Sequence, residues 1–258
     1  MNAEDIANDI AKRCGLLPFG FDSEKADMLY KQKEKELQAR INQAYLDYHD
    51  DKKKMLYSRI PDKYKSMKFA DLTKTASNEQ MIKHCSQYVK NYSRHHKGFG
   101  IIGDMGIGKT TLMAITGVQL IKKYEQSVYF STEEALLDEI RKSYDDDSYD
   151  SPEDVVNRIG DHDVVMIDEL GQSTSNWSVL AIKRVIDTVI NNNGKVFITT
   201  NYNSEELMKR WGYSKENKSP MQVIDRLFEV TDFYTMKGVS IRRQVNKGAK
   251  NEQGSFDW

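Results

Sequence analysis

A glycine-rich loop between two apolar segments constrains this chain more than any other feature. Residues 98–102 (GFGII) are typical of a short buried strand, and residues 109–124 are typical of a helix. The run between them, Gly103–Thr110 (GDMGIGKT), fits the pattern G-x-x-x-x-G-K-[ST] at every fixed position. A strand, a tight glycine turn and a helix in this order predict one unit of a parallel α/β sheet.

The residue types of this loop suit the binding of phosphate groups. Glycine lets the backbone turn so that its N–H groups face phosphate oxygens, where a side chain would block the approach. The following helix adds its positive N-terminal end, and Lys109 can place a compact charge on the β and γ phosphates. We therefore expect ATP to be bound by the whole loop: Gly103, Asp104, Met105, Gly106, Ile107, Gly108, Lys109, Thr110 and Thr111.

A second motif, Asp168-Glu169, ends the apolar run Val164–Ile167. Asp168 is expected to hold Mg²⁺ together with the hydroxyl of Thr110. Glu169 is the group that would orient and deprotonate the attacking water. Such a pair standing alone could be a solvated strand end, but its combination with the glycine-rich loop favours the catalytic interpretation.

Three more polar residues are candidates for contact with the γ-phosphate. Asn201 follows an apolar strand and could bond the γ-phosphate or the attacking water, although asparagine at a strand end also often starts a turn. Arg226 lies in a segment with helical apolar spacing, and Arg242 lies in Gly238–Arg243. Taken alone, each arginine could be an ordinary surface residue, but an arginine finger changes phosphoryl-transfer rates by roughly 10³ to 10⁵.

Residues 60–247 alternate strand and helix patterns. This alternation predicts an α/β fold with a five-stranded parallel sheet sandwiched by helices. Strands are expected at 98–102, 127–131, 164–167, 195–200 and 233–236. Helices are expected at 109–124, 133–144, 152–159, 179–191 and 204–211.

Residues 1–59 are charge-rich and are predicted to form a small all-helical domain. Apolar residues recur on one helical face at steps of four, four and three: Leu37, Ile41, Tyr45 and Tyr48. The pattern indicates either a helical hairpin that packs on itself or an apolar stripe offered to a partner helix. Pro61 marks the expected boundary with the α/β core, and residues 248–258 are expected to be a flexible tail.

Composition excludes some classes of function. The net charge of −1 gives no overall basic signal for nucleic acid, so any DNA contact would need a local patch. Cys14 and Cys85 lack metal-ligand spacing and are expected to be reduced thiols of a cytosolic protein. No apolar run is long enough to cross a bilayer, so we expect a cytoplasmic protein without a membrane partner.

In this order, the motifs resemble those of AAA+ ATPases, and the sequence most resembles the DnaC/DnaI family of bacterial replicative helicase loaders. The resemblance covers about residues 60–245 and leaves residues 1–59 outside it. Five stretches carry it: Ile60–Phe69, which is similar to the lead-in before the core, Val165–Gly171, Ile198–Asn203, Val223–Leu227 and Ser240–Arg242.

The resemblance implies an ATP hydrolase that loads a DnaB-type hexameric helicase onto single-stranded DNA during replication initiation. The N-terminal domain would grip the helicase; unlike in some loaders, no zinc ligands accompany it. Arg226 would act in trans on the ATP of a neighbouring subunit and Arg242 in cis, which implies a self-oligomer with ATP at the subunit boundary. One departure is Gln222, where similar loaders often carry a second arginine.

The family also contacts single-stranded DNA from a helical insertion after the second strand. Here that insertion is Glu133–Tyr144, in which Arg141, Lys142 and Tyr144 lie close together, and Trp177 is a further aromatic candidate. Cations can meet phosphates, and an aromatic ring can stack on a base. Alternatively, the cations pair with neighbouring carboxylates and Trp177 caps a helix.

Two other functions stay open at this point. A transposition helper ATPase of the IstB type, a near relative, would bind duplex DNA and a transposase, and would be expected to be strongly basic. A replication regulator that uses ATP as a switch would hydrolyse little ATP, and the presence of Glu169 argues against it.

Overall fold

The computed structural model describes residues 28–29, 31–37, 51–76, 78–145 and 150–238. The chain divides into two compact units, residues 1–50 and residues 51–258. In the first unit, the described residues 28–29 and 31–37 are helical, and residues 31–37 are all exposed. Ile41, Tyr45 and Tyr48 of the predicted apolar stripe lie outside the described residues.

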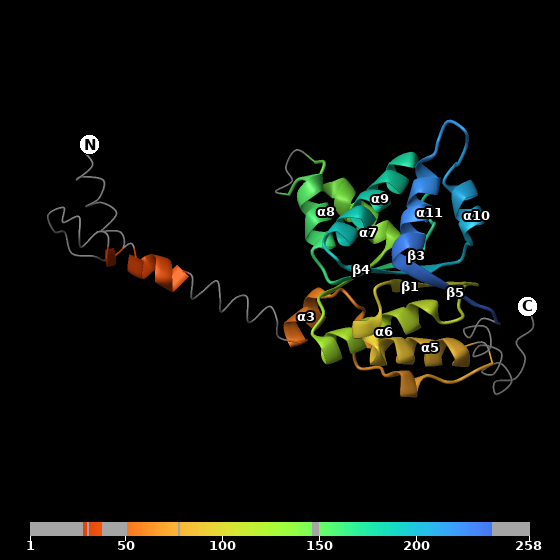
Figure 1. The fold of residues 1–258 in the computed structure, drawn as a ribbon, viewed down its shortest axis with the longest axis horizontal. Helices are drawn as coiled ribbons and strands as arrows, with labels where there is room; N and C mark the ends of the chain where they lie inside the picture. Colours follow the sequence, from red (N-terminus) through yellow and green to blue (C-terminus); the bar gives the residue numbers. More distant parts are fainter. Residues whose placement is uncertain (1–27, 30, 38–50, 77, 146–149, 239–258) are drawn as a thin grey trace, which may run out of the picture. The chain divides into compact units, whose positions relative to one another are not determined.

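The second unit is built on a parallel sheet of five strands in the order β2-β3-β4-β1-β5 (Figure 1). The strands are β1 (Gly98–Gly103), β2 (Val128–Thr132), β3 (Val164–Leu170), β4 (Lys195–Thr200) and β5 (Thr231–Met236). The predicted α/β class and five-stranded parallel sheet are confirmed. Because the strands are parallel, their carboxyl ends share one edge, where the loops after β1, β3 and β4 meet.

Helices cover both faces of the sheet (Figure 1). One face carries α3 (Asp51–Tyr57), α5 (Glu79–Lys90) and α6 (Lys109–Tyr124). The other carries α7 (Glu133–Lys142), α8 (Pro152–Gly160), α9 (Asn176–Asn191), α10 (Ser204–Arg210) and α11 (Ser219–Val230). Short turns complete the first face: α4 (Asp62–Lys65), η1 (Phe69–Asp71) and η2 (Tyr92–Arg94).

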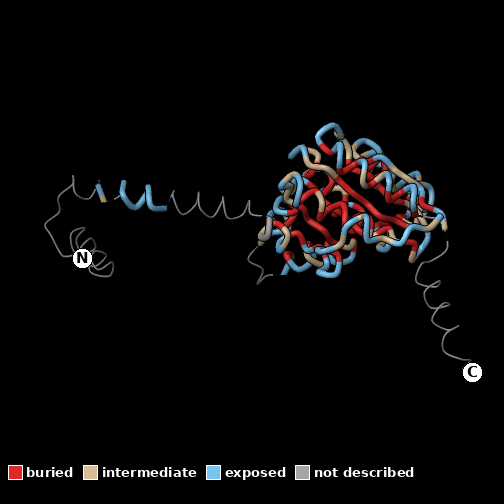
Figure 2. Tube along the Cα trace, turned by 90° about the horizontal axis from the view of Figure 1, so that it is seen from below, coloured by how far each residue is buried: buried red, intermediate tan, exposed pale blue. Residues whose placement is uncertain are grey.

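The central strands are apolar at nearly every position because both faces of the sheet are covered by helices. In β3, Val164 and Met166 pack into the core on the α6 side, whereas Val165 and Ile167 pack into the core beneath α9. Strands covered on both faces need hydrophobic side chains in both directions, which removes the usual alternation. Figure 2 shows this buried chain running through the middle of the α/β unit. Cys85 of α5 belongs to this core, and burial raises the pKa of its thiol to about 12.

The α/β unit begins before the boundary expected at residue 59. Helix α3 packs against α6 and β2, and the N–H of Phe130 donates to the carbonyl of Ser58 at 2.8 Å. Arg59 has φ 59° and donates to both carboxylate oxygens of Glu139 on α7. These contacts attach residues 51–60 to the edge strand β2, so the compact unit starts at Asp51.

None of the described helices has the length and hydrophobicity that crossing a bilayer requires.

Candidate nucleotide site

The glycine-rich loop follows β1 and leads into the first turn of α6. Gly106 and Gly108 have φ values of 83° and 101°, which side chains rarely adopt. A Cβ on Gly103 would lie 2.2 Å from the carbonyl oxygen of Met236, so the loop also needs glycine where it passes β5. The local sequence therefore fixes a tight turn that aims backbone N–H groups at the start of a helix.

Lys109 is almost entirely buried at the centre of this turn. Its Nζ donates to the carbonyls of Gly103 and Asp104, at 2.7 and 2.9 Å, and to Oδ1 of Asn201 at 2.7 Å. Burial lowers the pKa of Lys109, and Asp168, Glu169 and Asp104 oppose that shift. The ammonium is thus held by weak neutral acceptors in a partly desolvated place, where an anionic ligand would be a stronger partner.

Asp168 lies near the end of β3 and is nearly fully buried. Its Oδ1 accepts hydrogen bonds from the hydroxyl of Thr110 at 3.0 Å and from the hydroxyl of Thr199 on β4. Burial raises the pKa of Asp168, while these two hydroxyls and Lys109 oppose the shift. A carboxylate and a hydroxyl oxygen side by side suit Mg²⁺, so Thr110 and Asp168 fit the metal that the sequence predicted.

Glu169 is exposed by an irregularity in the strand. Its φ is 59°, and the register between β3 and β4 shifts between Ile167 and Leu170. The Glu169 N–H donates to the hydroxyl of Thr199 at 3.0 Å. Irregular backbone of this kind costs free energy and tends to mark functional sites, because a bulge re-aims one side chain without ending the strand.

The predicted phosphate, metal and water-activating residues meet in one place. A cavity of about 170 Å³ is lined by Tyr64, Met105, Gly106, Gly108, Lys109, Thr110, Thr111, Glu169 and Asn201. Asn201 reaches this cavity because β4 lies between β1 and β3 in the sheet. Tyr64 of α4 was not singled out as a site residue by the sequence analysis, although it lies in the stretch Ile60–Phe69 that carries the family resemblance.

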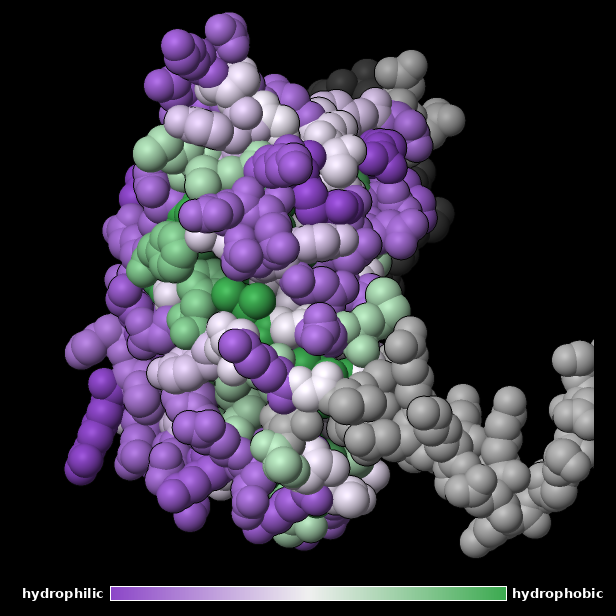
Figure 3. Space-filling view, turned by 90° about the vertical axis from the view of Figure 1, so that its right-hand side faces the viewer, coloured by the Kyte–Doolittle hydropathy of each residue, from purple (hydrophilic) through white to green (hydrophobic). Residues whose placement is uncertain are grey.

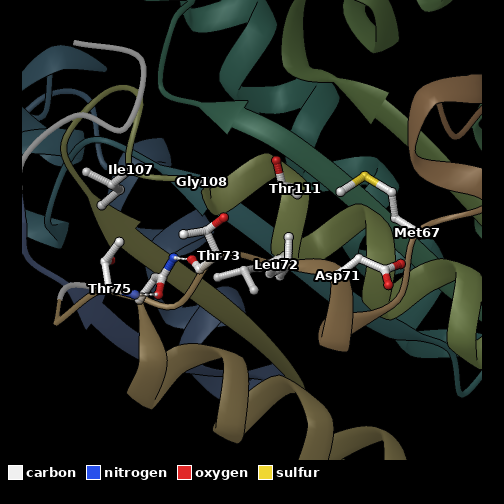
Figure 4. Close-up of a pocket in the computed structure, with 10 residues that line it drawn as sticks. Met67, Asp71, Leu72, Thr73, Thr75, Ile107, Gly108 and Thr111 are labelled. Carbon is white, nitrogen blue, oxygen red and sulfur yellow. Dashed lines mark hydrogen bonds between the residues drawn. The ribbon is translucent and has the colours of Figure 1, made fainter. Parts of the chain in front are cut away.

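A second, larger cavity of about 390 Å³ adjoins the first (Figure 4). The two share Gly108 and Thr111. The other lining residues are Met67, Asp71, Leu72, Thr73, Thr75, Asn78, Ile107 and Leu112. Asn78 shapes one wall, since its side chain donates to the carbonyl of Thr73 and accepts from the N–H of Thr75, at 3.0 and 2.8 Å. The segment before β1 thus encloses a mixed apolar and polar pocket beside the glycine-rich loop.

The two predicted arginines have different outcomes. Arg226 lies on α11, half-exposed, with its Nε 3.1 Å from Asp187 of α9 and its Nη1 2.7 Å from Glu229. It does not line the 170 Å³ cavity of its own chain. Arg242 lies outside the described residues.

The candidate DNA-contacting residues come together from two helices. The guanidinium of Arg141, at the end of α7, lies 5.0 Å from the ring centre of Trp177 at the start of α9. Tyr144 packs its ring edge-on to Trp177 at 6.3 Å. Arg141 also pairs with Asp138 at 2.7 Å, as the alternative interpretation expected, and Lys142 is exposed beside it. The sequence did not indicate that Trp177 contacts Arg141 and Tyr144, because more than 30 residues separate it from them.

The sheet order, the glycine-rich loop after β1, the acidic pair on β3 and Asn201 after β4 define an AAA+ P-loop domain. Residues 24–249 match the family described as IstB-like ATP binding protein, and the chain belongs to that family. The domain is therefore an ATP-binding module.

Solved structures share this fold. A DnaC helicase loader is 22% identical, with 69% of this chain and 100% of that chain covered and a TM-score of 0.58. DnaI is 19% identical, with 70% and 93% covered and a TM-score of 0.55. A putative primosome component from Streptococcus pyogenes serotype M3 is 18% identical, with 70% and 91% covered and a TM-score of 0.56. No curated protein matches the chain significantly.

Proposed function

We propose that this protein hydrolyses ATP to load a DnaB-type hexameric helicase onto single-stranded DNA. The convergence of Lys109, Glu169 and Asn201 on one cavity supports hydrolysis most directly. The loading role is supported by the fold shared with a DnaC helicase loader and DnaI. The first of these structures is described as a helicase loader, and the step from its fold to this chain's activity is part of the proposal.

In this proposal, ATP spans both cavities. The triphosphate lies on the glycine-rich loop, and the base and sugar enter the 390 Å³ pocket, where Leu72 and Ile107 offer apolar contacts. Lys109 leaves its carbonyl partners for the β and γ phosphates. Thr110 and Asp168 would hold Mg²⁺, which would neutralise charge on the phosphate oxygens.

Glu169 then accepts a proton from the attacking water, which Asn201 helps to orient. Both side chains line the same cavity as Lys109, so a water held between them faces the end of the triphosphate. The exposed position of Glu169 suits this role, because the carboxylate is not committed to the buried metal position beside Asp168.

Oligomerisation is part of the proposal because Arg226 is absent from the cavity of its own chain. Helix α11 also exposes two large apolar side chains, Met221 and Phe228. The face shown in Figure 3 is mainly hydrophilic, with hydrophobic residues grouped near its middle. A neighbouring subunit that covered α11 would bury Met221 and Phe228 and bring Arg226 to the neighbour's ATP.

Replacing Arg226 by alanine should lower ATP hydrolysis by the assembled oligomer by about 10³-fold, the usual effect of removing an arginine finger. Nucleotide binding by the monomer should be unchanged, and stability should change little because exposed ion pairs contribute about 0–1 kcal/mol. Turnover with helicase and DNA present is the measurement. The matched control is Arg158→Ala, since Arg158 is exposed to a similar extent and also pairs with two carboxylates, Glu139 and Asp150. Normal turnover by the Arg226 variant would rule out the trans-acting role.

Single-stranded DNA would be held by the cluster of Arg141, Tyr144 and Trp177, with Lys142 as a further cation. Tyr144 is about half exposed, so its ring is available to a base, and the exposed guanidinium of Arg141 is available to a phosphate. Stacking of this kind contributes about 1–3 kcal/mol per base and tolerates any sequence, as a loader requires.

The decisive experiment mixes the full-length protein with a hexameric replicative helicase and sizes the mixture with and without ATP. The proposal expects a complex in which the helicase co-elutes with several copies of this chain, and expects the complex to place the helicase on single-stranded DNA. A helicase that never co-elutes with the protein under either condition would contradict it.

The family match supports a second candidate, an IstB-like helper ATPase of transposition. This function would require binding of duplex DNA and of a transposase. A filter-binding comparison of duplex and single-stranded DNA over a series of salt concentrations separates the two candidates. Preference for duplex DNA favours the helper, and preference for single strands favours the loader. The near-neutral net charge gives no support to extensive duplex binding.

A further inference from the structure

Glu133 is a buried carboxylate that the site described above does not use. It is the first residue of α7 and has no exposed surface. Its Oε2 accepts hydrogen bonds from the N–H groups of Gly171 and Gln172, at 2.6 and 2.7 Å. Its Oε1 has no hydrogen-bond partner among the described residues. Burying a carboxyl group costs free energy unless hydrogen bonds compensate for it, and here the N–H groups of Gly171 and Gln172 supply that compensation.

The backbone that Glu133 holds follows the proposed general base almost directly. Only Leu170 separates Glu169 from Gly171, and both Glu169 and Gly171 have positive φ, 59° and 98°. The backbone therefore turns twice within three residues, so a small shift of the Gly171 N–H would change the direction of the Glu169 side chain. A Cβ on Gly171 would lie 2.5 Å from Leu207, so this turn has little free space.

Two other contacts hold the loop after β3 and the far end of α7 in place. From α10, Nε of Arg210 donates to the carbonyl of Gly171 at 2.8 Å. At the other end of α7, Arg141 contacts Trp177, where the loop from Gly171 enters α9. Helix α7 thus touches both ends of the segment that leaves the catalytic strand. Among these contacts, only Glu133, the first residue of α7, accepts hydrogen bonds from backbone N–H groups close to Glu169.

We infer that Glu133 is a positioning residue: through the N–H groups of Gly171 and Gln172, it sets the orientation of Glu169 toward the attacking water. This inference rests on the proposed ATP hydrolysis. The requirement is geometric, an acceptor oxygen at the position of Oε2, since a displacement of roughly 1 Å in a catalytic group can lower a rate by about 10²-fold.

Substitutions of Glu133 can show whether the loop needs an acceptor oxygen at this position or a negative charge. Burial raises its pKa, and the backbone N–H groups of Gln172 and Gly171 oppose that shift. Glutamine has the same shape and keeps an acceptor oxygen, so Glu133→Gln should hold the loop without a buried charge. Aspartate keeps the charge but withdraws the oxygens by one methylene, and methionine keeps the volume without an oxygen acceptor. Either of these two should release the loop.

The test compares Glu133→Gln, Glu133→Asp and Glu133→Met with the wild type, using affinity for a fluorescent ATP analogue and kcat. The aspartate and methionine variants should lose at least about tenfold in kcat, with ATP affinity within about threefold of wild type. The glutamine variant should stay within about threefold of the wild-type kcat. The control is Glu139→Gln on the same helix, which contacts Arg59, Tyr129 and Arg158 instead of the loop and should leave kcat unchanged.

Hydrogen exchange of the segment 170–172 supplies a second readout that needs no turnover. Exchange there should be faster in the aspartate and methionine variants and close to wild type in the glutamine variant. If one of the first two does not fold, the other carries the comparison. Wild-type kcat in either, or equal losses of kcat and ATP affinity, would overturn the inference, and so would unchanged exchange. A wild type that hydrolyses no ATP with helicase and DNA present defeats the proposed function; the exchange result then still decides whether Glu133 holds the loop.

Discussion

Replacing Lys109 by alanine should abolish ATP binding. Lys109 is the buried cation of the glycine-rich loop, and it now satisfies its ammonium with two carbonyls and the Asn201 side chain. Its loss removes charge-assisted hydrogen bonds of about 1.5–3 kcal/mol each. Two such bonds to phosphate correspond to at least about a 100-fold loss of affinity. Titration with a fluorescent ATP analogue measures the effect directly.

The control for this change is Lys123→Ala. Lys123 lies at the other end of the same helix, exposed and over the ring of Tyr124. It should bind ATP as the wild type does, with a similar melting temperature. If Lys109→Ala remains folded and keeps wild-type affinity, the assignment of the glycine-rich loop as the triphosphate site is incorrect.

Replacing Glu169 by glutamine should leave ATP bound but slow its hydrolysis by about 10²- to 10⁴-fold, the usual contribution of a general base. Glutamine has nearly the same shape, so the bulge and the hydrogen bond from the residue 169 N–H to Thr199 should persist. The carboxylate is exposed in the cavity and makes no ion pair among the described residues, so stability should be unaffected. Steady-state turnover and nucleotide titration separate the two effects.

A matched control for Glu169→Gln is Glu134→Gln, an exposed glutamate in the first turn of α7. It should hydrolyse ATP normally. The same experiment addresses the alternative of an ATP-switched regulator. Turnover near zero in the wild type, even with helicase and DNA present, would favour the switch and would leave Glu169 without a catalytic role.

Local patterns were sufficient to predict the sheet and most of the residues that line the 170 Å³ cavity. The apolar runs of β1, β3 and β4 are bounded by glycine, acidic or asparagine residues, so each strand end carries its own marker. Helix α5 was not predicted, although its buried residues recur at helical spacing: Met81, Ile82, Cys85, Tyr88 and Val89. The pocket beside the loop, which is lined in part by Asp71 of η1 and by Asn78 just before α5, was also missed.

Contacts between distant segments could not be predicted. The ion pair between Arg226 and Asp187 joins α11 to α9. The contact between Arg141 and Trp177 joins α7 to α9. Glu133 resembled any glutamate in the first turn of a helix, where a negative charge is ordinarily exposed and stabilising. Its burial follows from the placement of the β3 loop above α7, which no local pattern encodes.

The sequence by itself determined the glycine-rich loop, because the φ values of Gly106 and Gly108 and the chemistry of Lys109 and Thr110 are local properties of eight consecutive residues. Only the tertiary structure decided what surrounds that loop. The strand order brings Asp168 and Asn201 to it from β3 and β4, and Glu133 to the backbone behind Glu169. Parallel strands align their carboxyl ends regardless of separation along the chain, so the candidate catalytic residues are brought together by the sheet and not by sequence spacing.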